Sequence, residues 1–199
     1  MVSCIVIGLP RHVVDKPRLV YTKPGMGKTT CAFFQPGTMN IMFASTHLDP
    51  RSKDLQKEEL DFRASGKQRR YAWDYDAEMD IFVADAKTNA LTRLTSAKGY
   101  DAEGSYSPDG QWIVFSRLDA ANKGQLCRMP LAGGAETVLT PYIEGVQQAH
   151  PTWSLDDQTI YYSYYDRVTN GLRGSSRLLL PPAGDEEEGS ESPEPTGGA

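Results

Sequence analysis

One strand–turn–strand motif occurs three times in this chain of 199 residues, and this repetition restricts the fold more than any other feature. The copies align without gaps over residues 31–45, 103–117 and 150–163. Each copy has an aromatic residue before its turn and an isoleucine after it: Phe34 and Ile41, Tyr106 and Ile113, Trp153 and Ile160. Internal repeats of this kind indicate a fold built from equivalent supersecondary units.

The turn chemistry is clearest in the second copy, where residues 107–110 read SPDG. Proline fixes φ at the second turn position, and aspartate and glycine suit the positions after it. The flanking runs alternate apolar and polar residues or are rich in β-branched and aromatic residues, as strands are. Each copy therefore predicts a β-hairpin.

A second hairpin follows each of the first two copies, at 80–95 and 125–140, with turns at Thr88-Asn89 and Gly133-Gly134. Two hairpins per unit make a four-stranded antiparallel sheet. Tyr106 and Trp153 are 47 positions apart, close to the ~40–45 residues of a β-propeller blade. The predicted fold is therefore all-β, with about three propeller blades of four antiparallel strands each.

The first unit is longer than the second by 25 residues. The surplus lies at about 47–72 and is rich in charged residues, and 53–63 within it could form a short polar helix. Two interpretations remain open for this insertion: a solvated loop, or a partner-binding element of the kind that insertions in repeat proteins often supply.

The run YSPDGQWIVFS at 106–116 resembles the WD-like repeat of TolB-like β-propellers, which also occurs in the propeller domains of prolyl-oligopeptidase-class peptidases. The likeness extends over about 23–166. It implies the following division: an N-terminal segment that could be a partial blade (1–22), blades at 23–95, 96–140 and 141–178, the last of them incomplete in one interpretation, and an acidic tail (179–199). Because propellers have about four to eight blades, we expect an incomplete ring: a fragment of a longer propeller, or one that is completed by association.

The tail from 181 onward has no large apolar residue and is dense in Pro, Gly, Ser and Glu, so we expect it to be disordered. Its six acidic residues account for the net charge of −5, and the nearly neutral remainder gives no electrostatic footprint for nucleic acid. We also expect no membrane insertion, because no stretch approaches the ~20 apolar residues of a span. The N-terminus lacks the basic start of a signal peptide.

Motifs that would carry chemistry are incomplete. The stretch PGMGKTT at 24–30 is similar to a phosphate-binding loop, but Thr22 stands where its first glycine should be, and the chain continues into a predicted strand. Gly104-Ser105-Tyr106 lacks the spacing of a nucleophile elbow. The three histidines (12, 47 and 150) have no partner at metal-ligand or triad spacing, and the three cysteines (4, 31 and 127) are expected to be small buried residues. We therefore expect no catalytic residue, metal or cofactor.

Cys31, Glu103 and His150 hold the same place, three residues before each motif aromatic. The inner strand of a blade lines the central channel, so these residues should lie near one of its mouths. Tyr100 and Asp101, in the expected loop before Glu103, are open to the same two interpretations, which follow. The candidate binding residues are thus Tyr100, Asp101, Glu103 and His150, as a polar rim for a ligand or peptide; alternatively, these residues fix the strand ends.

The resemblance implies a periplasmic or exported protein, and the leading hypothesis is a non-catalytic scaffold that binds a protein or peptide. The alternative is the detached propeller domain of a prolyl-oligopeptidase-class serine peptidase that lacks its hydrolase domain. Open blade edges would also allow self-association.

Overall fold

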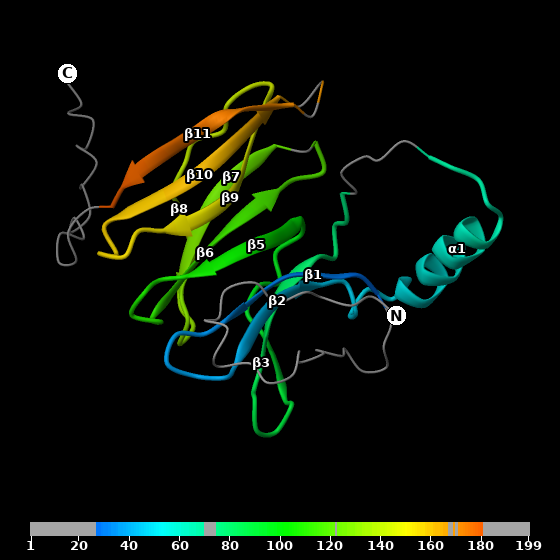
Figure 1. The fold of residues 1–199 in the computed structure, drawn as a ribbon, viewed down its shortest axis with the longest axis horizontal. Coiled ribbons are helices and arrows are strands. Elements are labelled where there is room, and N and C mark those ends of the chain that lie inside the picture. Colours follow the sequence, from blue (N-terminus) through cyan, green and yellow to red (C-terminus); the bar gives the residue numbers. More distant parts are fainter. Residues whose placement is uncertain (1–26, 70–74, 122, 167–168, 170, 181–199) are drawn as a thin grey trace, which may run out of the picture.

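The computed structural model describes residues 27–180, except 70–74, 122, 167, 168 and 170. Three antiparallel sheets follow one another along the chain, each a meander in sequence order (Figure 1). The first sheet consists of β1 (Thr29–Phe34), β2 (Ile41–Ser45), β3 (Asp80–Ala84) and β4 (Leu91–Arg93). The second consists of β5 (Tyr100–Tyr106), β6 (Trp112–Leu118), β7 (Gly124–Pro130) and β8 (Thr137–Val138). The third consists of β9 (Val146–Trp153), β10 (Thr159–Asp166) and β11 (Leu172–Leu179).

This architecture confirms the predicted all-β fold of propeller-like, four-stranded antiparallel sheets, and the described residues do not close a ring. The three repeat copies are the hairpins β1–β2, β5–β6 and β9–β10, and the second hairpins are β3–β4 and β7–β8. Among the described residues the third sheet has three strands rather than four. The N-terminal segment (1–22), Cys4, His12 and the tail from 181 onward lie outside the described residues.

The hairpin turns are held by their own polar side chains. In the second sheet the Ser107 hydroxyl accepts the backbone N–H of Trp112 at 2.9 Å, and in the third the Ser154 hydroxyl accepts that of Thr159 at 2.9 Å. Gly110 has a φ of +71°, in the left-handed region that glycine adopts without steric cost. The expected turn chemistry therefore fixes the register of these hairpins.

The core lies between neighbouring sheets, because alternate residues of a strand point to opposite faces. Ile113 and Phe115 of β6, both 0% exposed, pack against Met42 and Ile81 of the first sheet. The opposite face of the second sheet, including Val114, packs against the third sheet. Phe115 aligns with Phe43 and Tyr162, and Ile113 with Ile41 and Ile160, so the repeats predict a buried face here, and the structure confirms it. Trp112 aligns with Asn40 and Thr159, which predicts an exposed side chain, but it is half-buried, and the Arg128 guanidinium lies 4.9 Å from its ring centroid.

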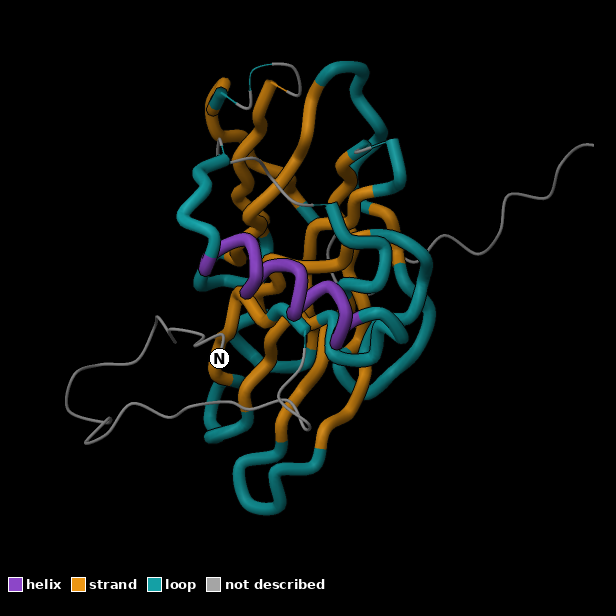
Figure 2. Tube along the Cα trace, turned by 90° about the vertical axis from the view of Figure 1, so that its right-hand side faces the viewer, coloured by secondary structure: helices purple, strands orange, loops and turns teal. Residues whose placement is uncertain are grey.

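The insertion contains α1 (Ser52–Ala64), which confirms the expected short polar helix. The helix projects to one side of the first sheet (Figures 1 and 2). Its surface carries the ion pair Arg63–Glu59 at 2.7 Å and the pair Lys57–Asp61. A hydrogen bond of 3.2 Å from the backbone N–H of Gly27 to Gln56 Oε1 links α1 to the segment that leads into β1.

Candidate functional site

The innermost strand of each sheet is interrupted at the same place. Cys31, Glu103 and His150 have φ values of +52°, +58° and +53°, in the left-handed region that residues other than glycine rarely adopt. The pairing register with the next strand shifts around each of the three residues. Each inner strand therefore contains a β-bulge, a feature that re-aims side chains and is common near functional sites.

These bulges come together because the inner strands β1, β5 and β9 are neighbours in space. They surround a pocket of about 380 Å³ with mostly apolar walls. The residues that line the pocket are Cys31, Ala32, Phe33, Glu103, Ser105, His150, Pro151 and Thr152. The structure thus brings the three equivalent repeat positions to one site.

Glu103 is engaged within the protein. Its Oε2 accepts the backbone N–H of His150 at 2.9 Å and the Ser116 hydroxyl at 3.1 Å. Its Oε1 lies 3.3 Å from Nε2 of His150, and its side chain is only 4% exposed. These contacts support the interpretation of Glu103 as a residue that fixes the strands, since a carboxylate with this many partners is structurally satisfied.

His150 offers more of its surface to the pocket, with a side chain that is 44% exposed. Its Nδ1 lies 3.2 Å from the Tyr165 hydroxyl, and the two rings meet edge to face with centroids 5.7 Å apart. Phe33, 37% exposed, adds an accessible aromatic surface from β1. An imidazole, a phenyl ring and a thiol on apolar walls suit binding through packing and a few directed hydrogen bonds.

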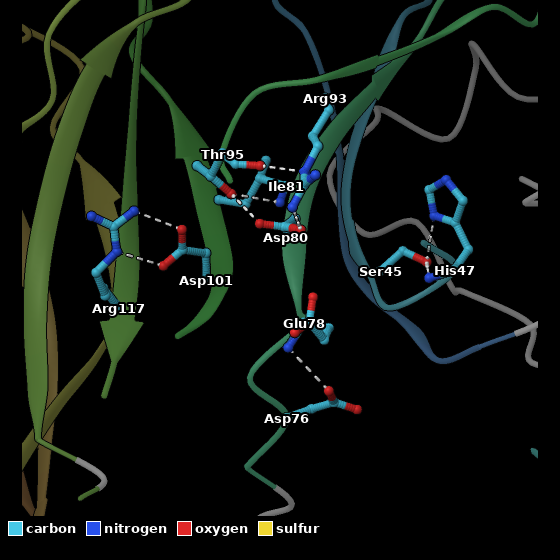
Figure 3. Close-up of polar contacts among 10 residues, drawn as sticks. All are labelled: Ser45, His47, Asp76, Glu78, Asp80, Ile81, Arg93, Thr95, Asp101 and Arg117. Atoms are coloured by element: carbon cyan, nitrogen blue, oxygen red, sulfur yellow. Dashed lines mark hydrogen bonds and ion pairs between the residues drawn. The ribbon is translucent and has the colours of Figure 1, made fainter. Parts of the chain in front are cut away.

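Tyr100 and Asp101 do not line this pocket. Both belong to β5 rather than to a loop before it, and they are 5% and 0% exposed. Arg117 donates two hydrogen bonds of 2.7 Å to the Asp101 carboxylate (Figure 3). Tyr100 belongs to a buried cluster with Leu118. Two of the four candidate residues, Glu103 and His150, therefore meet, and the other two stabilise the sheet interior.

The sequence analysis did not identify the ion pair between the buried Asp80 and the partly exposed Arg93. Arg93 donates a hydrogen bond of 2.5 Å to Asp80, and Thr95 lies between Asp80 and Asp101 (Figure 3). Burial raises the pKa of Asp80 to about 6, although the Arg93 guanidinium opposes the shift. No sequence motif announces this pair, because it depends on the register of β3 against β4.

The described residues show little of the geometry that catalysis requires. The Cys31 sulfur lies 3.3 Å from the Thr30 hydroxyl, and burial raises the pKa of the Cys127 thiol to about 11, which disfavours its reactive thiolate. The glycine-rich stretch leads into a strand and not a helix, since Thr29 begins β1. Over the described ranges, no group of three or more His, Cys, Asp or Glu is arranged to hold a metal ion. No helix in this part of the chain is long and apolar enough to span a membrane.

The sequence profile of the TolB β-propeller domain matches residues 59–196 of this chain. An uncharacterised protein of Agrobacterium fabrum is 30% identical over 125 residues, which are 62% of this chain and 42% of that protein. The chain therefore spans less than half of that relative's length.

Two solved structures are also similar to parts of this chain. A putative TolB from Agrobacterium tumefaciens is 27% identical, with a TM-score of 0.40 over 45% of this chain and 31% of that one. TolB from Acinetobacter baumannii is 16% identical, with a TM-score of 0.51 over 84% of this chain and 36% of that one. The similarity to the Acinetobacter baumannii protein is a similarity of fold.

Proposed function

Because this chain belongs to the family of TolB β-propeller domains, we propose that it is a non-catalytic scaffold that binds a protein or peptide partner. The observation that carries the proposal is the convergence of three equivalent bulges on one pocket at the inner strands. The left-handed backbone conformation, which is unfavourable for residues other than glycine, occurs there once in each of the three sheets. Strained backbone of this kind clusters at functional sites.

The residues that line the pocket suit the binding of a peptide better than the binding of a reacting small molecule. Its walls are mostly apolar, and Phe33 of β1 and His150 of β9 both line it with partly exposed rings. Aromatic side chains are enriched among the residues that dominate protein interfaces. Glu103 holds the β9 bulge in place by its contact with the His150 backbone, so the binding surface would be preorganised.

A photocrosslinking experiment tests this site. The photoreactive residue p-benzoylphenylalanine replaces Phe33 in one variant and Leu155 in a control, since Leu155 is 96% exposed on the β9–β10 turn, outside the pocket. We expect a discrete crosslinked protein from position 33 in the native host, weakened by His150→Ala, and none from position 155. Identical products from both positions, or none from position 33, would contradict binding at the pocket.

The absence of catalysis is tested separately on the purified chain. We expect no covalent labelling by a serine-directed fluorophosphonate and no ATP turnover. Labelling at a single serine would favour the peptidase-related alternative.

We further propose that the protein acts in the periplasm or another exported compartment, as its family resemblance suggests. Alkaline phosphatase fused to the native gene product should then be active, and an inactive but stable fusion would contradict the placement.

A further inference from the structure

The side chains at the three bulges do not make equivalent contacts. Glu103 Oε2 accepts the backbone N–H of His150 at 2.9 Å, so β5 supplies an acceptor to the bulge of β9. Cys31 holds on β1 the place that Glu103 holds on β5, and β1 lies beside β5 as β5 lies beside β9. The Cys31 side chain is shorter, and a thiol is a weak acceptor. The repeat therefore supplies no comparable acceptor from β1 to the bulge of β5.

The residue that supports the Glu103 carboxylate also differs between the sheets. Ser116 lies opposite the residue before the β5 bulge, and its hydroxyl donates to Glu103 Oε2 at 3.1 Å. In the first sheet Ala44, which has no hydroxyl, lies opposite the residue before the β1 bulge. A thiol and a methyl group thus replace a carboxylate and a hydroxyl, and Cys31 and Glu103 both line the pocket.

The backbone at Glu103 repeats the backbone at His150. Their φ values are +58° and +53°, and the register with the next strand shifts around each. The His150 N–H points to the neighbouring inner strand, so the Glu103 N–H should point in the same way toward β1 and the pocket. Among the described residues no side chain accepts the Glu103 N–H. Buried backbone N–H groups nearly always have an acceptor, and Glu103 is only 6% exposed.

We propose that the pocket holds an extended peptide by one of the peptide's backbone carbonyl oxygens, which accepts the Glu103 N–H where β1 supplies no acceptor. The inference rests on the proposed function and names the contact by which the peptide is held. A neutral carbonyl suits this place better than a carboxylate, because the Glu103 carboxylate lies beside the donor and would repel an anion. Apolar side chains of the peptide would pack on Phe33 and the mostly apolar walls.

The chain can be given the acceptor that β1 lacks. Cys31→Gln places a neutral carbonyl oxygen on a side chain as long as that of Glu103, and Cys31→Met fills similar space with only a weak acceptor. We expect the Glu103 amide of Cys31→Gln, relative to the other amides of β5, to exchange with solvent about fivefold more slowly than that of Cys31→Met, as one added hydrogen bond predicts. NMR of the full chain measures this exchange. If the wild-type amide is already as slow as that of Cys31→Gln, the chain itself supplies the acceptor and the proposal is wrong.

A small probe tests binding directly and also decides if Cys31→Gln does not fold. The probe is N-acetylphenylalanine methylamide, which has one apolar side chain and two backbone carbonyls. In the wild type we expect the Glu103 amide proton to move downfield and saturate as the probe is added. Cys31→Gln should bind the probe about fivefold more weakly than Cys31→Met, because its own side chain already occupies the donor.

Two results of the titration would overturn the inference. If the signals of Phe33 and His150 shift but the Glu103 amide proton does not, the pocket binds the probe without this hydrogen bond, and the proposed function stands. If no residue that lines the pocket responds up to the solubility limit of the probe, the carbonyl contact is also refuted. Crosslinking from position 33 then tests the proposed function by itself.

Discussion

The Glu103 carboxylate accepts the backbone N–H of His150 at 2.9 Å, so a side chain of the second sheet holds the β-bulge of the third. The two residues occupy equivalent repeat positions, both with φ near +55°. The contact joins neighbouring sheets at their inner strands, β5 and β9, which lie side by side. It therefore couples the stability of the second and third sheets to the shape of the pocket between them.

Loss of the Glu103 carboxylate should be costly for this reason. We expect Glu103→Ala to lower the free energy of unfolding by about 1.5–3 kcal/mol, because it removes charge-assisted hydrogen bonds and leaves the part-buried N–H of His150 without this acceptor. Urea denaturation measures the change. Glu103→Gln, which keeps an acceptor oxygen, should cost less.

His150→Ala is the matched control, since alanine retains the backbone N–H that Glu103 binds. In the double variant, Glu103→Ala should cost nearly as much as it does alone. If the cost disappears in the His150→Ala background, the imidazole contact at 3.3 Å, and not the backbone contact, is the one that matters.

Phe115 and Trp112 of β6 should differ in their contribution to stability. Phe115 is 0% exposed between the first and second sheets, and Phe115→Ala should cost about 3–5 kcal/mol. Trp112 is half-buried beneath Arg128, so Trp112→Ala should cost less, about 1–2 kcal/mol. Denaturant melts compare the two variants, and an equal or larger loss for Trp112→Ala would contradict the expectation that Phe115 contributes more packing than Trp112.

The sequence predicts most of this fold because its signals are local. Turn residues such as Ser107 and Gly110 act within their own hairpin, and the gap-free repeats identify the residues, among them Ile113, that share one face. The polar helix in the insertion is visible for the same reason, as a charged segment with few apolar positions.

The site is only partly predictable, because a β-bulge breaks the alternation on which side-chain directions depend. The alignment placed Glu103 and His150 together, and both line the pocket. It could not show that Asp101, two residues before the bulge, turns instead to Arg117. Phe33 escaped notice because its exposure also follows from the bulge at Cys31.

The turn between β5 and β6 should tolerate glycine far better than alanine at position 110. Gly110 has a φ of +71°, and the nearest atoms to an added Cβ, on Pro36, are 3.7 Å away, so the cost is one of backbone conformation and not of a clash. Gly110→Ala should therefore destabilise by about 1–2 kcal/mol. Asp157 holds the equivalent turn position with a φ of +61°, and Asp157→Gly should be stabilising. Thermal melts measure both, and a neutral Gly110→Ala would mean that the turn rearranges freely.

The buried carboxyl of Asp80 should make stability depend on pH. Burial raises its pKa from 3.8 to about 6 against the opposing Arg93 guanidinium. Between about pH 4 and 6 the folded chain therefore keeps a proton that the unfolded chain has lost, so the contribution of Asp80 to stability falls as pH rises through this window. Asp80→Asn removes the titration. The free energy of unfolding of the wild type minus that of Asp80→Asn should fall from pH 4 to about 6.5 and then stay level, as measured by urea denaturation at each pH. A difference that instead grows with pH would show that Arg93 outweighs burial and holds this pKa below its ordinary value.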